Sequence, residues 1–351
     1  MSKNSIKPSA TLIEAINAIE STEKRLAVVV SDENRVVGTL TDGDIRRHVL
    51  KGLSLSDLAI DAMSANPIVA SVDTADSVLR KILANGNIRS LPLVDGLNKY
   101  VRTLHEMELG ADHVVIRNGK RFSAAIIMAG GEGTRLRPLT NNMPKPMVDI
   151  NGLPLLERQI RSLSNIGINL IYISVNYLSE VIENYFRNGE RFGVEIQYLH
   201  EGKKLGTAGA LSLLPDLEAF ESVLVMNGDI LTTSDFVNLL HFHTDQCAEI
   251  TVGAVDYNIQ IPYGVIQHDG VQVIAIQEKP SQHFLCNAGI YALSVKALRL
   301  IPTDTFFNMT DLIEQCLSEG LSISVFPVHE YWSDIGTKAD LDRARVDFMD
   351  L

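Results

Sequence analysis

A short apolar run followed at once by a glycine-rich, basic loop divides this chain into two parts. Residues 126–148 read IIMAGGEGTRLRPLTNNMPKPMV. The apolar run predicts a buried parallel strand, and glycines after such a strand let backbone amide groups approach an anion closely. Because more than a third of the 351 residues precede this loop, we expect a separate domain in front of it.

Composition excludes several classes of partner. The chain has 31 Lys and Arg against 43 Asp and Glu, a net charge of -12, which argues against nucleic acid or an anionic membrane as the main partner. A small anionic ligand remains compatible, because the loop gathers cations locally. No apolar run reaches spanning length, and the polar N-terminus does not resemble a signal peptide.

The three cysteines do not form a metal or redox motif. Cys247, Cys286 and Cys316 are odd in number and far apart in the sequence, so their spacing fits neither a zinc site nor a disulfide framework. We expect buried, reduced thiols and a cytoplasmic location.

The segment before the loop contains a gap-free internal repeat with an offset of 64 residues. Residues 23–40 align with residues 87–104, and each copy reads as helix, strand, turn, strand and helix. Copies this small should pack against each other to bury their apolar faces. We predict one repeat over 1–58, a second over 59–117, a linker over 118–122 and a larger domain over 123–351.

The repeat resembles a tandem pair of cystathionine-β-synthase-type (CBS) domains, an α+β fold. The most specific stretch is GTLTDGDIRR, residues 38–47. The resemblance implies an adenine nucleotide whose phosphate and ribose contact Thr41 and Asp44. The alternative is structural, with Thr41 as a helix N-cap and Asp44 favouring the helix dipole. The second copy carries His105 and Glu108 at the matching positions, so we expect at most one full site. Such pairs commonly associate, which predicts a homo-oligomer.

From residue 123 onward, apolar strands alternate with helical patterns. Strands are predicted at 170–175, 194–198 and 222–227, and helices at 155–166, 178–186, 207–214 and 234–243. This alternation predicts an α/β fold with a doubly wound, mostly parallel sheet. Ligands of such sheets bind beyond the carboxyl ends of the strands, where the glycine-rich loop begins.

The loop is neither a Walker loop nor a Rossmann fingerprint. GGEGTRLRPLT followed by PKPM resembles the signature of the sugar-1-phosphate nucleotidyltransferases, over about residues 123–345. The resemblance implies that Arg135 and Lys145 act on a nucleoside triphosphate. It also implies nucleotide binding by Ala129, Gly130, Gly131, Gly133 and Thr134.

Four further stretches support the resemblance in the expected order. KLGTAGAL supplies Gly206 and Thr207 to the nucleotide, unless Thr207 only caps a helix. VLVMNGDIL, residues 223–231, contains Asp229 just after its apolar strand; we interpret Asp229 as a metal ligand, with a turn aspartate as the alternative.

The last two of these stretches concern the sugar and the metal. IQEKP and NAGIY place Glu278, Asn287 and Gly289 at the sugar, and Lys279 at its phosphate as a catalytic residue; the alternative is a surface Glu–Lys pair. YWSDIGT supplies Asp334 as a second Mg²⁺ ligand, or as a helix N-cap that Thr337 could provide instead.

The resemblance therefore implies transfer of a nucleotidyl group from a nucleoside triphosphate to a sugar 1-phosphate, with Mg²⁺ as cofactor. A non-catalytic nucleotide-sensing regulator is an alternative of another class. Several sugars remain open: mannose, glucosamine, glucose or a heptose.

Glu201 favours GTP as the nucleotide. Relatives that use thymidine or uridine triphosphates typically carry a glutamine at this position. An ionised carboxylate only accepts hydrogen bonds, so it matches the N1–H and 2-amino group of guanine better than two pyrimidine carbonyls. Two alternatives stay open: a thymidylyl- or uridylyltransferase acting on glucose 1-phosphate, and a Glu201 that faces solvent and pairs with Lys203 or Lys204.

Overall fold

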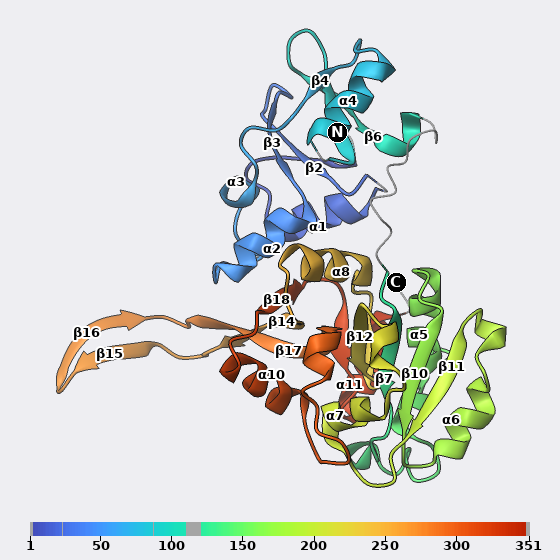
Figure 1. Cartoon of the computed structure of the whole chain (residues 1–351). Coiled ribbons are helices and arrows are strands. Elements are labelled where there is room, and N and C mark those ends of the chain that lie inside the picture. The colour runs from blue at the N-terminus through green and yellow to red at the C-terminus, as the bar shows by residue number, and fades with distance from the viewer. Residues whose placement is uncertain (1–2, 23, 87, 110–120, 349–351) are drawn as a thin grey trace. The chain divides into compact units, whose positions relative to one another are not determined.

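The chain folds into two compact units, Met1–Gly119 and Lys120–Leu351. The computed structural model describes residues 3–22, 24–86, 88–109 and 121–348 (Figure 1). Residues 118–120 of the predicted linker lie outside the described part. Within those described ranges, no helix combines the length and apolar character needed to cross a membrane.

The N-terminal unit contains two similar copies of one motif, each built on a three-stranded sheet, β1-β2-β3 and β4-β5-β6. The first copy consists of β1 (Ser5–Ile6), α1 (Leu12–Glu20), β2 (Ala27–Val30), β3 (Val36–Leu40) and α2 (Asp42–Leu50), followed by α3 (Ala59–Ala62). The second consists of β4 (Ala70–Ser71), α4 (Asp76–Gly86), β5 (Ser90–Val94), β6 (Tyr100–His105) and the 3-10 helix η1 (Glu106–Leu109). The second copy therefore has η1 where the first has α2.

The two copies pack against each other, as the repeat predicted. A shared buried cluster joins Val28 and Val30 of the first copy to Val94 and Tyr100 of the second. The backbone amide of Tyr100 also donates to the carbonyl of Asn34 at 2.8 Å. Burial of both sheets in one cluster removes apolar surface that neither small copy could cover alone.

The C-terminal unit is built on a seven-stranded sheet in the order β11-β10-β7-β12-β17-β14-β18. β7, β10, β11 and β12 are parallel, β17 runs antiparallel to β12, and β18 is parallel to β14. The strand bounds are β7 (Ala124–Met128), β10 (Leu170–Val175), β11 (Glu195–His200), β12 (Ser222–Asn227), β14 (Ile250–Gln260), β17 (Ser281–Ser294) and β18 (Ile323–Val328).

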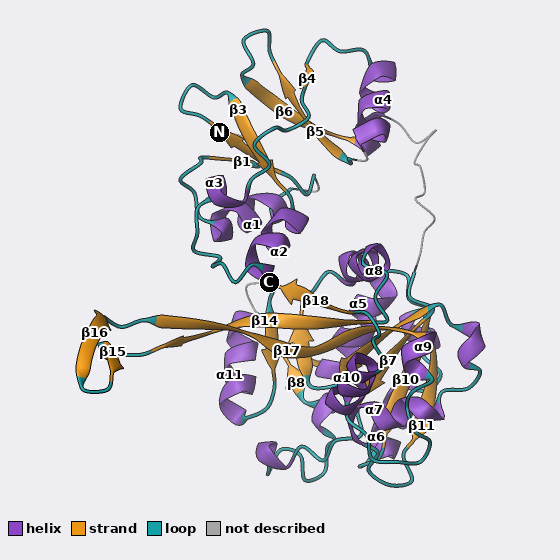
Figure 2. Cartoon of the chain, turned by 60° about the vertical axis from the view of Figure 1, so that its left-hand side comes forward, coloured by secondary structure: helices purple, strands orange, loops and turns teal. Residues whose placement is uncertain are grey.

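Helices cover both faces of this sheet, which confirms the doubly wound architecture (Figure 2). One buried cluster contains side chains of α5 (Leu155–Asn165), α6 (Ser179–Phe186) and α8 (Phe236–Asp245). A second cluster contains side chains of α7 (Gly206–Gly209), α9 (Val295–Leu298) and α10 (Met309–Ser318). The helix expected over 207–214 is divided, because α7 passes into the 3-10 helix η6 (Ala210–Leu213).

The cysteines differ from one another in exposure. Cys316 is buried, as expected, whereas Cys286 is half-buried and Cys247 is exposed, so the expectation of three buried thiols is wrong for two of them. All three are free thiols.

Short ladders outside the main sheet complete the C-terminal unit. β13 (Ile230–Thr232) pairs antiparallel with β19 (Trp332–Asp334), close to the final helix α11 (Lys338–Asp347). β8 (Asp149–Ile150) pairs with β9 (Leu153–Pro154). β15 (Val265–Asp269) and β16 (Gln272–Gln277) form the tip of a long ribbon that continues β14 and β17 (Figure 2).

Candidate active site

The β13–β19 ladder brings together two aspartates that are far apart in the sequence. Ile230 lies opposite Asp334 in this ladder, and the backbone amide of Ile335 donates to the carbonyl of Asp229 at 2.9 Å. Asp229 follows the end of β12, the strand beside β7. Both carboxylates therefore stand at the carboxyl edge of the sheet, where ligands of such folds bind.

A lysine ammonium lies between these carboxylates. Lys145 Nζ donates to Asp229 Oδ2 and stands 3.7 Å from Asp334 Oδ1. The lysine is only 8% exposed, and a buried ammonium is costly unless it is paired. The two aspartates supply that pairing.

Arg135 contributes a second cation at the same place. Gly336 lies beside both the Arg135 guanidinium and the Asp334 carboxylate. A Cβ added at Gly336 would be 3.5 Å from the guanidinium and 3.4 Å from Asp334 Oδ2. Partial burial raises the pKa of Asp334, the negative charge of Asp229 raises it further, and the charges of Lys145 and Arg135 oppose both effects. Two carboxylates and two cations, predicted from four separate stretches, thus form one cluster.

This cluster has the donors that a hard divalent cation requires. Asp229 and Asp334 direct oxygens at one ammonium, which shows that a positive charge can be held between them. Oxygen donors of this type suit Mg²⁺. A lysine in this position also balances the two carboxylates in the protein alone. The alternative of Asp334 as a helix cap is wrong, because Thr337 caps α11 through a capping box with Asp340.

The glycine-rich loop packs tightly against the cluster at one position and is open at another. Gly133 has φ +61°, and a Cβ there would lie 2.8 Å from Lys145 Cβ, so glycine is needed for the lysine to fit. Thr140 Oγ1 donates to the Gly133 carbonyl at 2.8 Å. A Cβ at Gly131 would meet nothing within 4 Å, which leaves its backbone accessible to a ligand. Thr134, beside Gly133, is exposed at the start of a 3-10 turn.

Glu201 closes the other side of the loop. Its carboxylate accepts hydrogen bonds from the Ser174 hydroxyl and from the Leu205 amide, the latter at 3.0 Å. A Cβ at Gly130 would lie 2.7 Å from Glu201 Oε1. The amide of Ala129, at the start of the loop, donates to the Ser174 carbonyl at 3.0 Å. Ser174 thus links the loop and the glutamate.

The alternative in which Glu201 pairs with a neighbouring lysine is wrong. Lys203 pairs with Asp304 at 3.0 Å, and Lys204 pairs with Glu132 at 2.6 Å. The bond from Lys204 lowers the pKa of the Glu132 carboxyl, and it joins the glycine-rich loop to the segment that follows Glu201.

Gly206 and Thr207 lie beside the start of α10. Gly206 has φ +82°, and a Cβ there would lie 2.6 Å from the Phe307 carbonyl. Thr207 Oγ1 accepts a hydrogen bond from the Met309 amide at 2.9 Å. Thr207 does not cap α7, whose N-cap is Leu205.

Two of the predicted sugar residues reach the site edge. The Gly289 amide donates to Asn287 Oδ1 at 2.9 Å, and a Cβ at Gly289 would lie 2.5 Å from Asn227 Nδ2. Asn227 ends β12, two residues before Asp229. Asn287 and Gly289 therefore lie next to the turn that carries Asp229.

Glu278 and Lys279 are not brought to this cluster. They follow β16 on the ribbon that stands out from the sheet (Figure 1). Both side chains are exposed. The Glu278 carboxylate lies beside Gly264, where an added Cβ would be 3.0 Å from Glu278 Oε2. Their predicted roles at the sugar and its phosphate remain predictions.

Comparison with known proteins agrees with this geometry. The nucleotidyl transferase family matches residues 124–350. The chain belongs to the nucleotidyl transferase family. The CBS domain family matches residues 1–51.

Relatives and solved structures of this family resemble the C-terminal unit. A UTP–glucose-1-phosphate uridylyltransferase from Synechocystis is 32% identical over 62% of this chain and 61% of its own length. A mannose-1-phosphate guanylyltransferase from Mycobacterium tuberculosis is 31% identical over 64% of each. This chain thus spans less than two thirds of the length of these relatives. The structure of HddC from Yersinia pseudotuberculosis complexed with GMP-PN has a TM-score of 0.51 at 26% identity, over 65% of this chain and all of that one.

The CBS-like unit of this nucleotidyl transferase holds its predicted ligand residues in local contacts. Thr41 caps α2 in a capping box with Asp44, whose carboxylate accepts from the Thr41 amide at 2.8 Å. Arg47 donates to the other oxygen of Asp44 at 2.6 Å. The structural role suggested by the sequence is therefore present, and it leaves the nucleotide role as a prediction.

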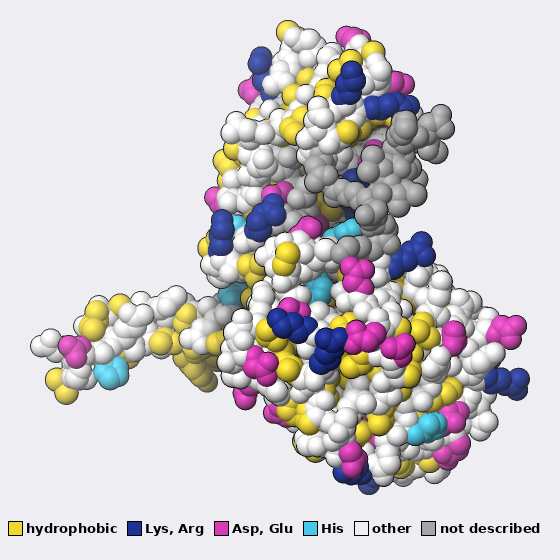
Figure 3. All heavy atoms as spheres, in the orientation of Figure 1, with side chains coloured by type: hydrophobic (Ala, Val, Ile, Leu, Met, Phe, Trp, Pro, Cys, Tyr) yellow, Lys and Arg dark blue, Asp and Glu magenta, His cyan; other side chains and the backbone are white. Residues whose placement is uncertain are grey.

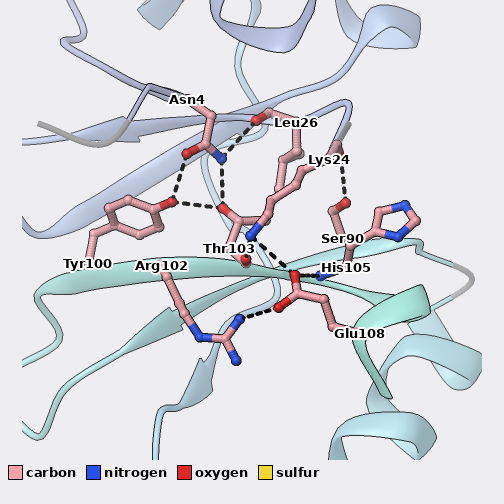
Figure 4. Close-up of polar contacts among 9 residues, drawn as sticks. All are labelled: Asn4, Lys24, Leu26, Ser90, Tyr100, Arg102, Thr103, His105 and Glu108. Carbon is pink, nitrogen blue, oxygen red and sulfur yellow. Dashed lines mark hydrogen bonds and ion pairs between the residues drawn. The ribbon is translucent and has the colours of Figure 1, made fainter. Parts of the chain in front are cut away.

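The matching position of the second copy is engaged by charged side chains from both copies (Figure 4). Glu108 pairs with Lys24 of the first copy at 3.1 Å and with Arg102 at 2.7 Å. The backbone amide of His105 donates to Glu108 at 2.9 Å. Asp44 and Glu108 thus both have local partners for their charge, and at most one full nucleotide site stays a prediction.

Gln159 is a supporting residue that the sequence motifs missed. Its Nε2 donates to the carbonyls of Asn227 at 3.0 Å and Ile230 at 2.7 Å, one on each side of the turn that carries Asp229. The residue is buried on α5. The sequence does contain a signal for this role. Gln159 is three residues after Leu156 and four before Leu163, which places its polar side chain on the core face of the helix.

We predict that Gln159→Leu destabilises the turn at Asp229. The substitution leaves two buried carbonyls without their donor, which typically costs about 1–3 kcal/mol. Urea unfolding should show this loss in the free energy of unfolding. Gln315→Leu is the control, because the Gln315 side chain donates to the side chain of Glu319 within the same helix, α10, and holds no turn. Equal stability of the Gln159 and Gln315 variants would contradict the role assigned to Gln159.

Proposed function

We propose that this protein transfers a nucleotidyl group from a nucleoside triphosphate to a sugar 1-phosphate and releases pyrophosphate. The observation that carries the proposal is the convergence of Arg135, Lys145, Asp229 and Asp334 at the carboxyl edge of the sheet. Such a set of cations and metal-binding carboxylates suits a reaction between two anions. The named activities of the uridylyl- and guanylyltransferase relatives support the same reaction class.

The proposed reaction needs no covalent intermediate on the protein. An oxygen of the sugar 1-phosphate forms a bond to the α-phosphorus, while the bond from that phosphorus to the oxygen bridging to the β-phosphate breaks. The electron pair leaves with pyrophosphate. The task of the protein is to align two anions that repel each other and to balance the charge that develops.

The charged residues of the cluster perform that alignment. Backbone amides at Gly130 and Gly131 face the triphosphate, because Gly131 is open and Gly130 is fixed against Glu201. Arg135 and Lys145 steady the phosphates, and Lys145 leaves its aspartate partners to do so. When bound by Asp229 and Asp334, Mg²⁺ supplies a Lewis acid that neutralises phosphate charge.

GTP is the favoured nucleotide. Glu201 is fixed at the loop rather than turned to solvent, which places an acceptor group beside Gly130. Each carboxylate oxygen has more than one lone pair, so the bonds from Ser174 and Leu205 leave room for guanine N1–H and the 2-amino group. The named guanylyltransferase relatives and the GMP-PN complex of HddC support this choice.

Other substrates remain as named alternatives. The uridylyltransferase relative, which is as similar as the guanylyltransferases, favours a uridylyl- or thymidylyltransferase acting on glucose 1-phosphate. The identity of the sugar is open among mannose, glucosamine, glucose and a heptose. The residues proposed to contact it are Asn287, Gly289, Glu278 and Lys279. A regulator without catalysis is disfavoured, because all four charged groups of the cluster are present together.

The N-terminal unit is proposed to bind an adenine nucleotide and to regulate the enzyme. Thr41 and Asp44 lie at the start of α2 with Asp42, Gly43 and Asp44 in its first turn. A helix N-terminus of this kind provides backbone amides for phosphate, and Asp44 would accept from ribose hydroxyl groups.

We expect Asp229→Asn to lower the rate of pyrophosphate release by about 10²–10³-fold, the usual effect of losing one such electrostatic contact. The assay uses a panel of nucleoside triphosphates and sugar 1-phosphates with Mg²⁺. Asp342→Asn is the matched control, because Asp342 is exposed on α11 and only pairs with Arg345 at 3.8 Å. Wild-type turnover in the Asp229 variant would remove Asp229 from the site. No pyrophosphate release by the wild type with any pair would favour the regulator.

The base preference gives a second prediction. The wild type should show the highest kcat/KM with GTP among GTP, ATP, CTP, UTP and dTTP, by about two orders of magnitude, because the wrong base leaves buried polar groups unpaired. Glu201→Gln should lose most of this preference, whereas Glu195→Gln should keep it, because Glu195 is exposed at the start of β11, the strand that Glu201 follows. If UTP or dTTP is preferred by the wild type, the base assignment is wrong while the reaction class stands.

The regulatory site gives a third prediction. AMP, which has no triphosphate to offer the active site, should raise the melting temperature of the full chain and change its rate. Asp44→Asn should abolish this response. Glu14→Gln is the control, since Glu14 forms the corresponding capping box with Thr11 on α1. An equal response in both variants would show that AMP binds elsewhere.

A further inference from the structure

A two-stranded ribbon leaves the sheet beside the candidate active site. β14 pairs with β18 as far as Val255, and β17 pairs with β12 from Ile290 onward. Between these points, the β14–β17 ladder continues alone to Gln260 opposite Ser281, and β15 and β16 extend it to a tip. We call residues 256–285 the ribbon; it is the long arm in Figures 1 and 2.

The ribbon exposes an unusual amount of apolar surface. Ile266 lies opposite Ile276 in the tip, and Ile274 follows on the same face of β16; their exposed fractions are 54, 66 and 68%. Nearer the sheet, Tyr257 lies opposite Phe284, and both are exposed. Apolar side chains gather along the ribbon in Figure 3, with few charged groups between them.

The backbone of the ribbon is also left open. Among the described strands, β15 and β16 pair only with each other, so both outer edges offer free donors and acceptors. Exposed edges of this kind are normally blocked or covered, and an isolated two-stranded hairpin is marginally stable in water. The ribbon therefore has the properties of one side of an interface.

The available area matches that of a protein dimer. Ten large apolar side chains of the ribbon are each at least 43% exposed. Three of them, Tyr257, Tyr263 and Phe284, are aromatic, the class that buries roughly 150–250 Å² per side chain. Together the ten present apolar surface on the order of the ~800 Å² that each partner contributes to a standard interface. The ribbon carries three acidic groups, Asp256, Asp269 and Glu278, and one basic group, Lys279, so its contact with a second copy depends on apolar burial and not on charge attraction between ribbons.

The ribbon carries two proposed sugar residues away from the site of its own chain. Asn287 lies at the site edge, and the ladder between Val255 and Gln260 runs without irregularity outward from it. Ser281 precedes Asn287 by six positions, or roughly 20 Å at about 3.3 Å per strand residue. Glu278 and Lys279 lie further out still. Bringing these two residues to the site of their own chain would require the paired strands to bend back sharply between Ser281 and Asn287, whereas this ladder runs straight outward in register.

We propose that the ribbon packs against the C-terminal unit of a second copy of this chain and places Glu278 and Lys279 at that copy's site. This inference rests on the proposed nucleotidyl transfer. Each site of the dimer then combines Asp229 and Asp334 of one chain with Lys279 of the other. An exchange of the same element between two copies follows a twofold axis, so both sites are completed at once.

The decisive experiment mixes two variants that are each inactive. Asp229→Asn removes a metal ligand but keeps the ribbon, and Lys279→Ala does the reverse. The two chains are co-expressed with different tags, and the heterodimer is purified on both. A shared site predicts about half of the wild-type rate in the heterodimer, because one of its two sites is complete. A heterodimer as inactive as its parents would overturn the proposal, as would full activity of Lys279→Ala alone.

A second measurement tests the interface without any assay of activity. Analytical ultracentrifugation of the wild type should show a dimer, and Ile274→Asp with Ile276→Asp should shift it to a monomer. Leu317→Asp is the control, since Leu317 on α10 is equally exposed, at 58%, but lies off the ribbon. A monomeric wild type, or a dimer that survives the ribbon substitutions, would overturn the proposal. A dimer of this kind with no transferase activity would reject the proposed function alone.

Discussion

The C-terminal unit depends on holding two like charges close together. Asp229 and Asp334 come from segments about a hundred residues apart, and the short β13–β19 ladder brings them side by side. Their repulsion is balanced by the buried ammonium of Lys145. Lys145 is in turn placed by Gly133, because only a residue without a Cβ leaves room for the lysine side chain. Loop, turn and ladder are thus coupled through one electrostatic arrangement.

Hydrogen bonds from surrounding polar groups hold the turn at Asp229 and the glycine-rich loop in place. Gln159 holds both sides of the turn that carries Asp229, and Glu201 connects the glycine-rich loop to β10 through Ser174. These contacts come from α5 and from the ends of parallel strands. The backbone around Asp229 and Glu201 is thus held in position before any ligand arrives, which lowers the cost of aligning two anions even though Lys145 must move.

The two units of the chain carry surfaces of different character. β17 begins in the apolar ribbon and then carries Asn287 and Gly289 past the site edge. The N-terminal unit instead joins its two copies by apolar contact between sheets and by a polar network of Asn4, Tyr100 and Thr103. We propose regulation for the N-terminal unit and assembly for the ribbon, and the charged cluster lies in neither of them.

The sequence alone determined the alternation of strands and helices and the internal repeat, because both are written in local spacing and residue type. The parallel sheet and the capping role of Thr41 and Thr337 followed from the same local signals. The charged residues of the cluster were picked out by the resemblance of their motifs to a known family. Only the tertiary structure decided which of these residues meet. The position of Lys145 between two aspartates, the partners of Glu201 and the support from Gln159 depend on contacts between distant segments. The outward course of the ribbon, which separates Glu278 and Lys279 from Asn287, depends on ladder register and on where pairing with the sheet stops, and neither is encoded in a short motif.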